Sequence, residues 1–170
     1  VADAVMNGNT TVLRGLLQQR VDVNAPQADG ATALHWAAYR NDLETADLLI
    51  RAGANPKATN REGASVLSLA CINGSAPMIE KLLNAGADAN EGLPNGETPL
   101  MMAARTGSVD ALNPLLRHGA DVNAREKLRG TTALMWAATE SHPPAVKVLI
   151  DHGADFNARS NPAPKGRSAY

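Results

Sequence analysis

The chain has 170 residues, enough for one ordinary domain or one short repeat array. Its 16 basic and 17 acidic residues nearly balance, so charge gives no reason to expect a nucleic acid or an anionic membrane as partner. The single cysteine excludes a disulfide within the chain, and no apolar run approaches the roughly 18 residues that a membrane-spanning helix needs. Aromatic residues make up only 3 %, so the core must be built from Leu, Ala, Val and Ile.

Two short patterns recur in fixed phase, about 33 residues apart. The pattern that closes each repeat, Gly-Ala followed by Asn or Asp, has an imperfect first copy at Val21-Asp22-Val23-Asn24. A period in this range indicates a stacked repeat array, in which each unit is one supersecondary element. The first pattern, Thr or Ser followed two places later by Leu, begins at Thr32, Ser65, Thr98 and Thr132. The second, Gly-Ala followed by Asn or Asp, begins at Gly53, Gly86, Gly119 and Gly153.

These residues resemble the ankyrin repeat, whose signature opens with T-P-L-H-x-A and closes, after two helices, with G-A-D-x-N-A. The resemblance extends from residue 1 to about residue 160. It implies an all-α solenoid of stacked helix-turn-helix pairs joined by β-hairpin fingers. The repeats would occupy about 1–26, 27–59, 60–92, 93–125 and 126–159, with fingers near 25–31, 58–64, 91–97 and 124–131.

The first repeat departs from the others at both ends. It begins directly at its first helix and has no finger before it. It also has Arg20 where the other repeats have the closing glycine. If the backbone there is left-handed, a side chain costs about 1 kcal/mol. We therefore expect an atypical terminal unit.

The second repeat shows how one unit is built. Thr32 can cap a short helix over 33–40, and Gly53 supplies the left-handed backbone that ends a second helix over 43–52. Apolar residues at helical spacing form one stripe on the second helix. A helix pair this short cannot bury its stripe alone, so it must stack on the next unit.

Three later positions break the pattern. Lys57 stands where the other repeats have Asn. Pro114 falls inside a second helix, where a proline removes a hydrogen bond and clashes with the preceding turn, at a cost of about 3 kcal/mol. The fourth finger, near 124–131, is one residue longer than its counterparts and is the most charged stretch of the array.

The end of the chain has two interpretations. Residues 166–170, Gly-Arg-Ser-Ala-Tyr, resemble the opening of a repeat, which predicts the start of a truncated sixth unit. The other interpretation is a chance match within a proline-containing tail over 161–170.

No residue pattern indicates catalysis. The four histidines are not spaced as metal ligands, and no phosphate-binding loop or nucleophile motif occurs. His35 is predicted to serve the hydrogen-bond network between turns, and Cys71 to be a small core residue. We therefore expect no enzyme, no catalytic or metal-binding residue and no cofactor.

The resemblance implies that partners dock on the concave side, which the first helices and the fingers form. Trp, Tyr and Arg are enriched among residues that dominate binding energy. For the two tryptophans the alternative is a half-buried position that closes the seam between repeats. The family's binding positions fall here on Trp36, Tyr39, Arg40, Arg61, Glu62, Ile72, Met102, Arg105, Arg129 and Trp136.

The predicted function is therefore a non-catalytic, monomeric protein–protein interaction module that binds a protein partner on its concave face. The alternative is an architectural segment of a longer array, with no partner of its own. The Arg- and Ala-rich, Lys-poor composition points weakly to a bacterial source. Single-cysteine usage is typical of a cytoplasmic protein and is also compatible with a periplasmic or secreted one.

Overall fold

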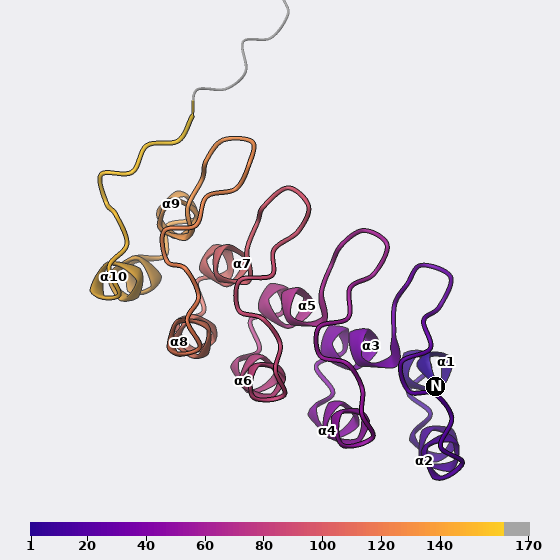
Figure 1. The fold of residues 1–170 in the computed structure, drawn as a ribbon. Helices are drawn as coiled ribbons and strands as arrows, with labels where there is room; N and C mark the ends of the chain where they lie inside the picture. The colour runs from indigo at the N-terminus through magenta and orange to yellow at the C-terminus, as the bar shows by residue number, and fades with distance from the viewer. Residues whose placement is uncertain (162–170) are drawn as a thin grey trace, which may run out of the picture.

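The computed structural model describes residues 1–161, and within this range the chain forms five stacked helix pairs (Figure 1). The repeat-like residues 166–170 lie outside the described range. The helices are α1 (Ala2–Met6), α2 (Thr10–Gln18), α3 (Ala33–Tyr39), α4 (Leu43–Arg51), α5 (Val66–Ile72), α6 (Ala76–Asn84), α7 (Pro99–Thr106), α8 (Val109–Arg117), α9 (Ala133–Thr139) and α10 (Pro143–Asp151).

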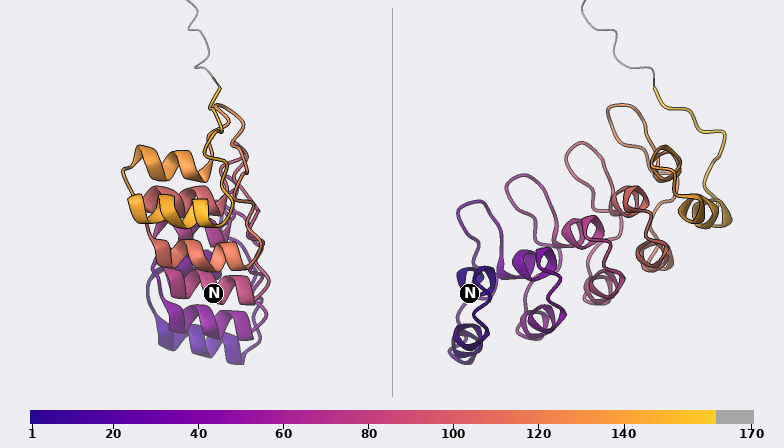
Figure 2. Two further views of the ribbon diagram at one scale, coloured as in Figure 1. Left: turned by 90° about the vertical axis from the view of Figure 1, so that its left-hand side faces the viewer. Right: turned by 180° about the vertical axis from the view of Figure 1, so that it is seen from behind.

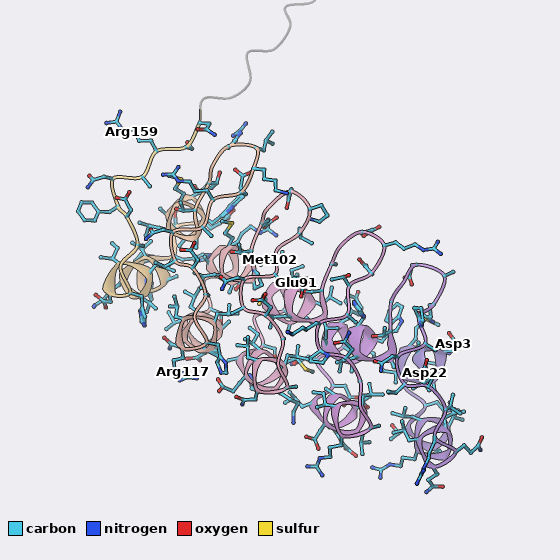
Figure 3. The ribbon with its side chains drawn as sticks, in the orientation of Figure 1. Asp3, Asp22, Glu91, Met102, Arg117 and Arg159 are labelled. Carbon is cyan, nitrogen blue, oxygen red and sulfur yellow. The ribbon has the colours of Figure 1, made fainter. Side chains whose placement is uncertain are left out.

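The helices form two rows. The odd-numbered helices make an inner row and the even-numbered helices an outer row, and all four fingers project from one side of the stack (Figures 1 and 2). Each inner helix packs on the next inner helix and on its own outer partner. Met102 lies along the inner row and Arg117 on the outer row (Figure 3). The predicted all-α solenoid is confirmed.

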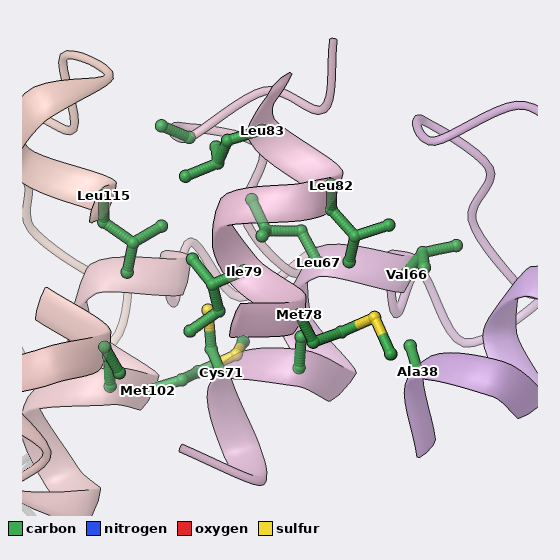
Figure 4. Close-up of a cluster of buried hydrophobic side chains, with 14 of the residues drawn as sticks. Ala38, Val66, Leu67, Cys71, Met78, Ile79, Leu82, Leu83, Met102 and Leu115 are labelled. Carbon is green, nitrogen blue, oxygen red and sulfur yellow. The ribbon is translucent and has the colours of Figure 1, made fainter. Parts of the chain in front are cut away.

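One apolar core runs through all five units because small and branched residues recur at fixed places. Leu82 of α6 and Leu115 of α8 occupy the same place on successive outer helices, and both are fully buried (Figure 4). On the inner row, fully buried alanines such as Ala37 and Ala70 let neighbouring helices approach closely. Cys71 lies in this core, where burial raises the pKa of its thiol. It is therefore a packing residue, as predicted.

The fingers are hairpin-shaped loops. Each is closed at its base by a backbone bond, as between the Gln27 N–H and the Ala31 carbonyl at 2.8 Å. Within residues 1–161 the one β-bridge joins Thr59 and Ser65, so the expected β-hairpins contain almost no strand. We name the loops finger 1 to finger 4, at residues 25–31, 58–64, 91–97 and 124–131.

Backbone bonds also link the tips of neighbouring fingers. The Arg61 N–H donates to the Asp29 carbonyl at 2.9 Å, and the Lys127 N–H donates to the Asn95 carbonyl at 2.8 Å. Between fingers 2 and 3 the corresponding residue is Pro94, which has no N–H to donate. Its ring instead lies against Gly63, where a Cβ atom would come within 2.6 Å of the ring Cδ. Fingers 2 and 3 therefore pack against each other at their tips without the backbone hydrogen bond that links the other pairs.

The predicted strain at Arg20 is confirmed. Its φ is 54°, in the left-handed region, as at the closing glycines of the later repeats, such as Gly53 with φ of 91°. An L-residue there costs about 1–2 kcal/mol because its Cβ crowds the following carbonyl. The first repeat thus ends in a less favourable backbone than the others.

Asparagine side chains join successive repeats through the loops that follow the outer helices. The Asn90 amide nitrogen donates to the Gly119 carbonyl at 3.0 Å, and its amide oxygen accepts the Asp121 N–H at 2.7 Å. Asn24 and Asn123 make the same pair of bonds to the repeats that follow them. Lys57 occupies this place in the second repeat and has no group that can both donate and accept.

Lys57→Asn is expected to raise the free energy of unfolding by about 1–2 kcal/mol, because two hydrogen bonds to the third repeat become available at about 1 kcal/mol each. By analogy with Asn90, the partners are the Gly86 carbonyl and the Asp88 N–H. Urea denaturation followed by circular dichroism measures the change. Asn123→Ala serves as the reverse control and should lower stability. An unchanged or lower value for Lys57→Asn would show that the two loops are too far apart to be clamped.

Helix α8 continues through Pro114, whose ring is buried. In a regular helix the N–H of residue 114 would donate to the Asp110 carbonyl, four residues earlier. Pro114 has no N–H, so this one backbone bond is lost, as predicted. Pro114→Val should therefore stabilise the protein by about 1–3 kcal/mol. Pro144→Val is the matched control, because Pro144 lies in the first turn of α10, where no helical bond is missing. If thermal denaturation shows that Pro114→Val lowers the melting temperature, contacts of the proline ring outweigh the lost bond.

Candidate interaction surface

Side chains at one register position form an exposed stripe along the inner row. Tyr39 and Ile72 occupy the same place near the ends of α3 and α5, and they are 61 % and 51 % exposed. Arg105 and Thr139 hold this place in the two units that follow, and both are exposed. Repeat symmetry puts the four side chains on one side of the stack. The predicted residues Tyr39, Ile72 and Arg105 thus share one surface.

Trp36 lies beside this stripe and is half-buried. Its ring meets Tyr39 edge to face, with centroids 6.0 Å apart, and its N–H donates to the Gln27 amide oxygen at 2.6 Å. With Asp29 and Leu69 it lines a pocket of about 240 Å³, which we call the finger-1 pocket. Trp36 therefore packs against the core and also reaches the surface, so the two roles proposed for it are compatible.

Trp136 is also half-buried, but its polar surroundings differ. The Arg105 guanidinium carbon lies 5.4 Å from the centroid of its ring, and Arg105 pairs with Glu97 at 3.2 Å. A cation over an indole face is attracted by the ring quadrupole. Trp136 lines a second pocket, of about 680 Å³, between finger 4 and α9. We call it the finger-4 pocket.

The prediction that Met102 lines the surface is wrong. Only 1 % of the residue is exposed, and it belongs to the buried cluster that contains Cys71 and Ile79 (Figure 4). Methionine is unbranched and flexible, so it fills irregular gaps between helices. Helix α7 packs between α5 and α9, and the side chain lies within that stack. Met102 is a core residue.

Arg40 lies away from the two pockets. It follows α3 at the turn to α4, and its guanidinium donates to the Met6 carbonyl at 3.2 Å. The same group lies over Gly8. Arg40 therefore holds the second repeat onto the first at the edge opposite the fingers, and the structure does not bring it to either pocket.

Arg61, Glu62 and Arg129 are exposed at the finger tips. The tip position that carries Asp29 in finger 1 is Glu62 in finger 2, Asn95 in finger 3 and Arg129 in finger 4. The side chain at this position thus changes from acidic through neutral to basic along the array. A partner that spans the fingers would meet opposite charges at the two ends.

Two residues of the surface were missed in the sequence. Gln27 fixes the Trp36 ring through its amide oxygen. Leu128, in finger 4, is 70 % exposed and lines the finger-4 pocket. Leu128 could have been recognised in the sequence, because it is an apolar residue within the most charged finger. Nothing in the local sequence marks Gln27 as the hydrogen-bond partner of the Trp36 indole, nine residues away.

The buried polar groups of the inner row have structural roles. The His35 ring accepts the Thr32 N–H at its Nδ1 over 3.1 Å, and its Nε2 lies 3.3 Å from the Ala64 carbonyl of the next finger. The Thr32 hydroxyl, expected to cap the helix, also lies 2.9 Å from Nδ1. Burial lowers the pKa of His35, which favours the neutral ring that these bonds require. The predicted network between turns is confirmed.

Among residues 1–161, His, Cys, Asp and Glu side chains nowhere gather in groups of three that could hold a metal ion. In the same range no helix has both the length and the apolar character needed to cross a membrane.

Comparison with known proteins places these observations in a family. A sequence model of ankyrin repeats in three copies matches residues 1–92 and 67–160. The chain is similar to the Notch-regulated ankyrin repeat-containing proteins of Xenopus laevis and Homo sapiens, at 40 % and 38 % identity over 63 residues. It spans about half the length of these curated relatives, since each match covers 35 % of this chain and 55 % of the relative.

These relatives, like that of Danio rerio, come from vertebrates, so they do not support the bacterial source that composition suggested. Ankyrin repeats are generally protein–protein interaction modules and are typically non-catalytic. The matched ranges together span nearly all of the described residues, and the helix pairs stack with fingers on one side, as the repeat pattern predicts. This chain therefore belongs to the ankyrin repeat family.

Proposed function

We propose that this chain is a non-catalytic, monomeric binding module whose protein partner docks on the surface formed by the inner helices and the fingers. The observation that carries the proposal is the stripe that begins with Tyr39 and Ile72, two large side chains left exposed at one register position. Tyrosine and arginine, which this stripe combines in Tyr39 and Arg105, are enriched among the residues that dominate binding energy. The finger-1 and finger-4 pockets lie beside this stripe.

Tyr39 is the side chain expected to contribute most to such an interface. It is rigid, it is already positioned by its edge-to-face contact with Trp36, and its hydroxyl can bond a partner. Little conformational entropy is lost when it is buried, because it has only two side-chain torsions. An aromatic residue of this kind commonly accounts for about 2 kcal/mol or more of binding free energy.

Tyr39→Ala is therefore expected to weaken binding of a captured protein partner by roughly 30-fold, the equivalent of about 2 kcal/mol. Lys147→Ala is the matched control on the outer helix α10, where the lysine pairs with Asp151 of its own helix at 2.6 Å. Calorimetric titration of both variants, each shown to be folded by circular dichroism, measures the difference. Equal affinities would place the interface on another face.

A second function is favoured by the last repeat, which presents a stacking groove that no part of residues 1–161 fills. The groove, of about 430 Å³, is lined by residues that include Ser141, Val146 and Ile150. The equivalent groove of the second repeat is filled by the third repeat, where the Ser75 hydroxyl donates to Asn41 at 2.5 Å. This supports an architectural role, as one segment of a longer array.

The path of the chain after α10 also supports continuation of the array. The Asn161 N–H donates to the Arg129 carbonyl at 2.6 Å, the same bond that Lys127 makes to finger 3. Arg125 also donates to the Arg159 carbonyl at 2.9 Å. Residues up to 161 therefore run beside finger 4 as a further finger would.

This second candidate is tested by replacing residues 162–170 with a copy of residues 62–92, which follow the equivalent finger position in the third repeat. If the groove accepts a helix pair, the free energy of unfolding rises and amides of α10 become more protected from hydrogen exchange. The control is the same fusion with Val146→Glu and Ile150→Glu in the groove. A fusion no more stable than this control would rule out stacking at this face.

A further inference from the structure

The finger-4 pocket is the larger of the two pockets on the proposed binding surface. It has about 680 Å³ against 240 Å³ for the finger-1 pocket. Met135 and Trp136 of α9 line it together with Leu128 and Arg129 of finger 4. Leu128 is 70 % exposed, although it is apolar. The pocket therefore combines an apolar wall with a cationic side chain.

The extra residue in finger 4 changes the hydrogen bonds beside the finger-4 pocket. Glu126 occupies the position in finger 4 that Gln27 occupies in finger 1. The Glu126 N–H closes its finger by donating to the Thr131 carbonyl, as the Gln27 N–H does by donating to the Ala31 carbonyl. The Glu126 carboxylate accepts the N–H groups of Leu128 at 2.6 Å, Arg129 at 2.7 Å and Thr131 at 2.9 Å. These bonds lower the pKa of Glu126 to about 2, so the group is ionised and is held within its own finger.

Trp136 is consequently left without the partner that Trp36 has. The Trp36 N–H is bound by Gln27 at 2.6 Å, whereas the buried Trp136 N–H has no hydrogen-bond partner among residues 1–161. A buried donor without a partner costs about 1–3 kcal/mol. An acceptor that enters the pocket can therefore bind the Trp136 N–H without an existing hydrogen bond being broken.

The residues at the equivalent finger tips of the two pockets carry opposite charges. Asp29 lines the finger-1 pocket, and Arg129 holds the equivalent tip position at the finger-4 pocket. The other charged residues that line the finger-4 pocket are already engaged, because Glu97 pairs with Arg105 and Glu126 binds its own finger. The Arg129 guanidinium has no hydrogen bond or ion pair within residues 1–161, so it is available to an anion.

We propose that the finger-4 pocket binds a segment of a protein partner in which a carboxylate side chain neighbours a large apolar one. The carboxylate pairs with Arg129, which suits planar, bidentate recognition of carboxylates. The apolar side chain lies against Leu128 and Met135, and an acceptor of the segment satisfies the Trp136 N–H. The proposal rests on the proposed function and adds the chemistry of the partner and its position on the array.

Selection from a phage-displayed library of random dodecapeptides tests this chemistry without a known partner. The peptides enriched on the full chain should place Asp or Glu beside Leu, Ile, Met or Phe. With a ¹⁵N-labelled protein, an enriched peptide should shift the indole N–H resonance of Trp136 and leave that of Trp36 in place. Enrichment of neutral or basic peptides, or none, would overturn the proposal.

Fluorescence anisotropy with an enriched peptide then assigns the contact. Arg129→Glu should weaken binding at least 10-fold, whereas Arg61→Glu, the same charge change at the tip of finger 2, should change it less than 2-fold. Equal effects would show a diffuse charge preference and overturn the pocket assignment. A peptide whose binding is sensitive to Tyr39→Ala but not to Arg129→Glu would also overturn it, while leaving the proposed function intact. If Tyr39→Ala has no effect on a protein partner, the proposed function itself fails.

Discussion

Met102→Ala is expected to lower the free energy of unfolding by about 2–5 kcal/mol, the range for truncating a fully buried side chain to alanine. The residue is 1 % exposed and packs with Cys71 and Ile79 in the middle of the array. Truncation removes its contacts and leaves a cavity that neighbouring helices can close only in part, because each helix also packs on the next unit. Urea denaturation followed by circular dichroism measures the loss.

Tyr39→Ala is the control for this prediction, since Tyr39 is 61 % exposed and its truncation should cost less than about 1 kcal/mol. The pair separates core from interface, because Met102→Ala should act on stability and Tyr39→Ala on binding. A loss below about 1 kcal/mol for Met102→Ala would mean that the side chain is not closely packed.

Gly107→Ala is expected to lower the free energy of unfolding by roughly 2–5 kcal/mol, from two causes. The backbone at Gly107 has φ of 73°, which costs an L-residue about 1–2 kcal/mol. In addition, a Cβ atom there would come within 2.5 Å of Cγ in the His142 ring. Overpacking of this kind adds about 1–3 kcal/mol. The ring is held by its Nε2, which lies 3.1 Å from the Arg105 carbonyl.

Gly53→Ala separates the two causes. Gly53 is also left-handed, with φ of 91°, but a Cβ atom there would meet nothing within 4 Å. Its substitution should cost only the backbone part, about 1–2 kcal/mol. Thermal denaturation of both variants gives the comparison. If the two variants lose equal stability, the His142 ring moves aside freely and the fourth and fifth repeats are less tightly joined than their contacts indicate.

The repeat pattern alone determined the fold and most of the core. The closing glycines marked where the outer helices end, because only a left-handed residue fits there, and Arg20 revealed its strain by standing in their place. Leu82 and Leu115 are both buried, since a helix pair must bury the same stripe in every unit. The engagement of His35 between turns also followed from its position in the repeat. Periodicity determines these features because each is local to one unit and its neighbour.

Only the tertiary structure decided which members of the candidate surface reach the solvent and which bonds they make. Trp36, Met102 and Trp136 share one repeat position, yet Met102 is buried because its narrow, flexible side chain fits between neighbouring inner helices. Arg40 is held by the first repeat, and the Trp136 N–H lacks a partner because Glu126 is engaged by its own finger. Such outcomes depend on side-chain shape and on competition for hydrogen bonds across units, which a repeated pattern does not encode.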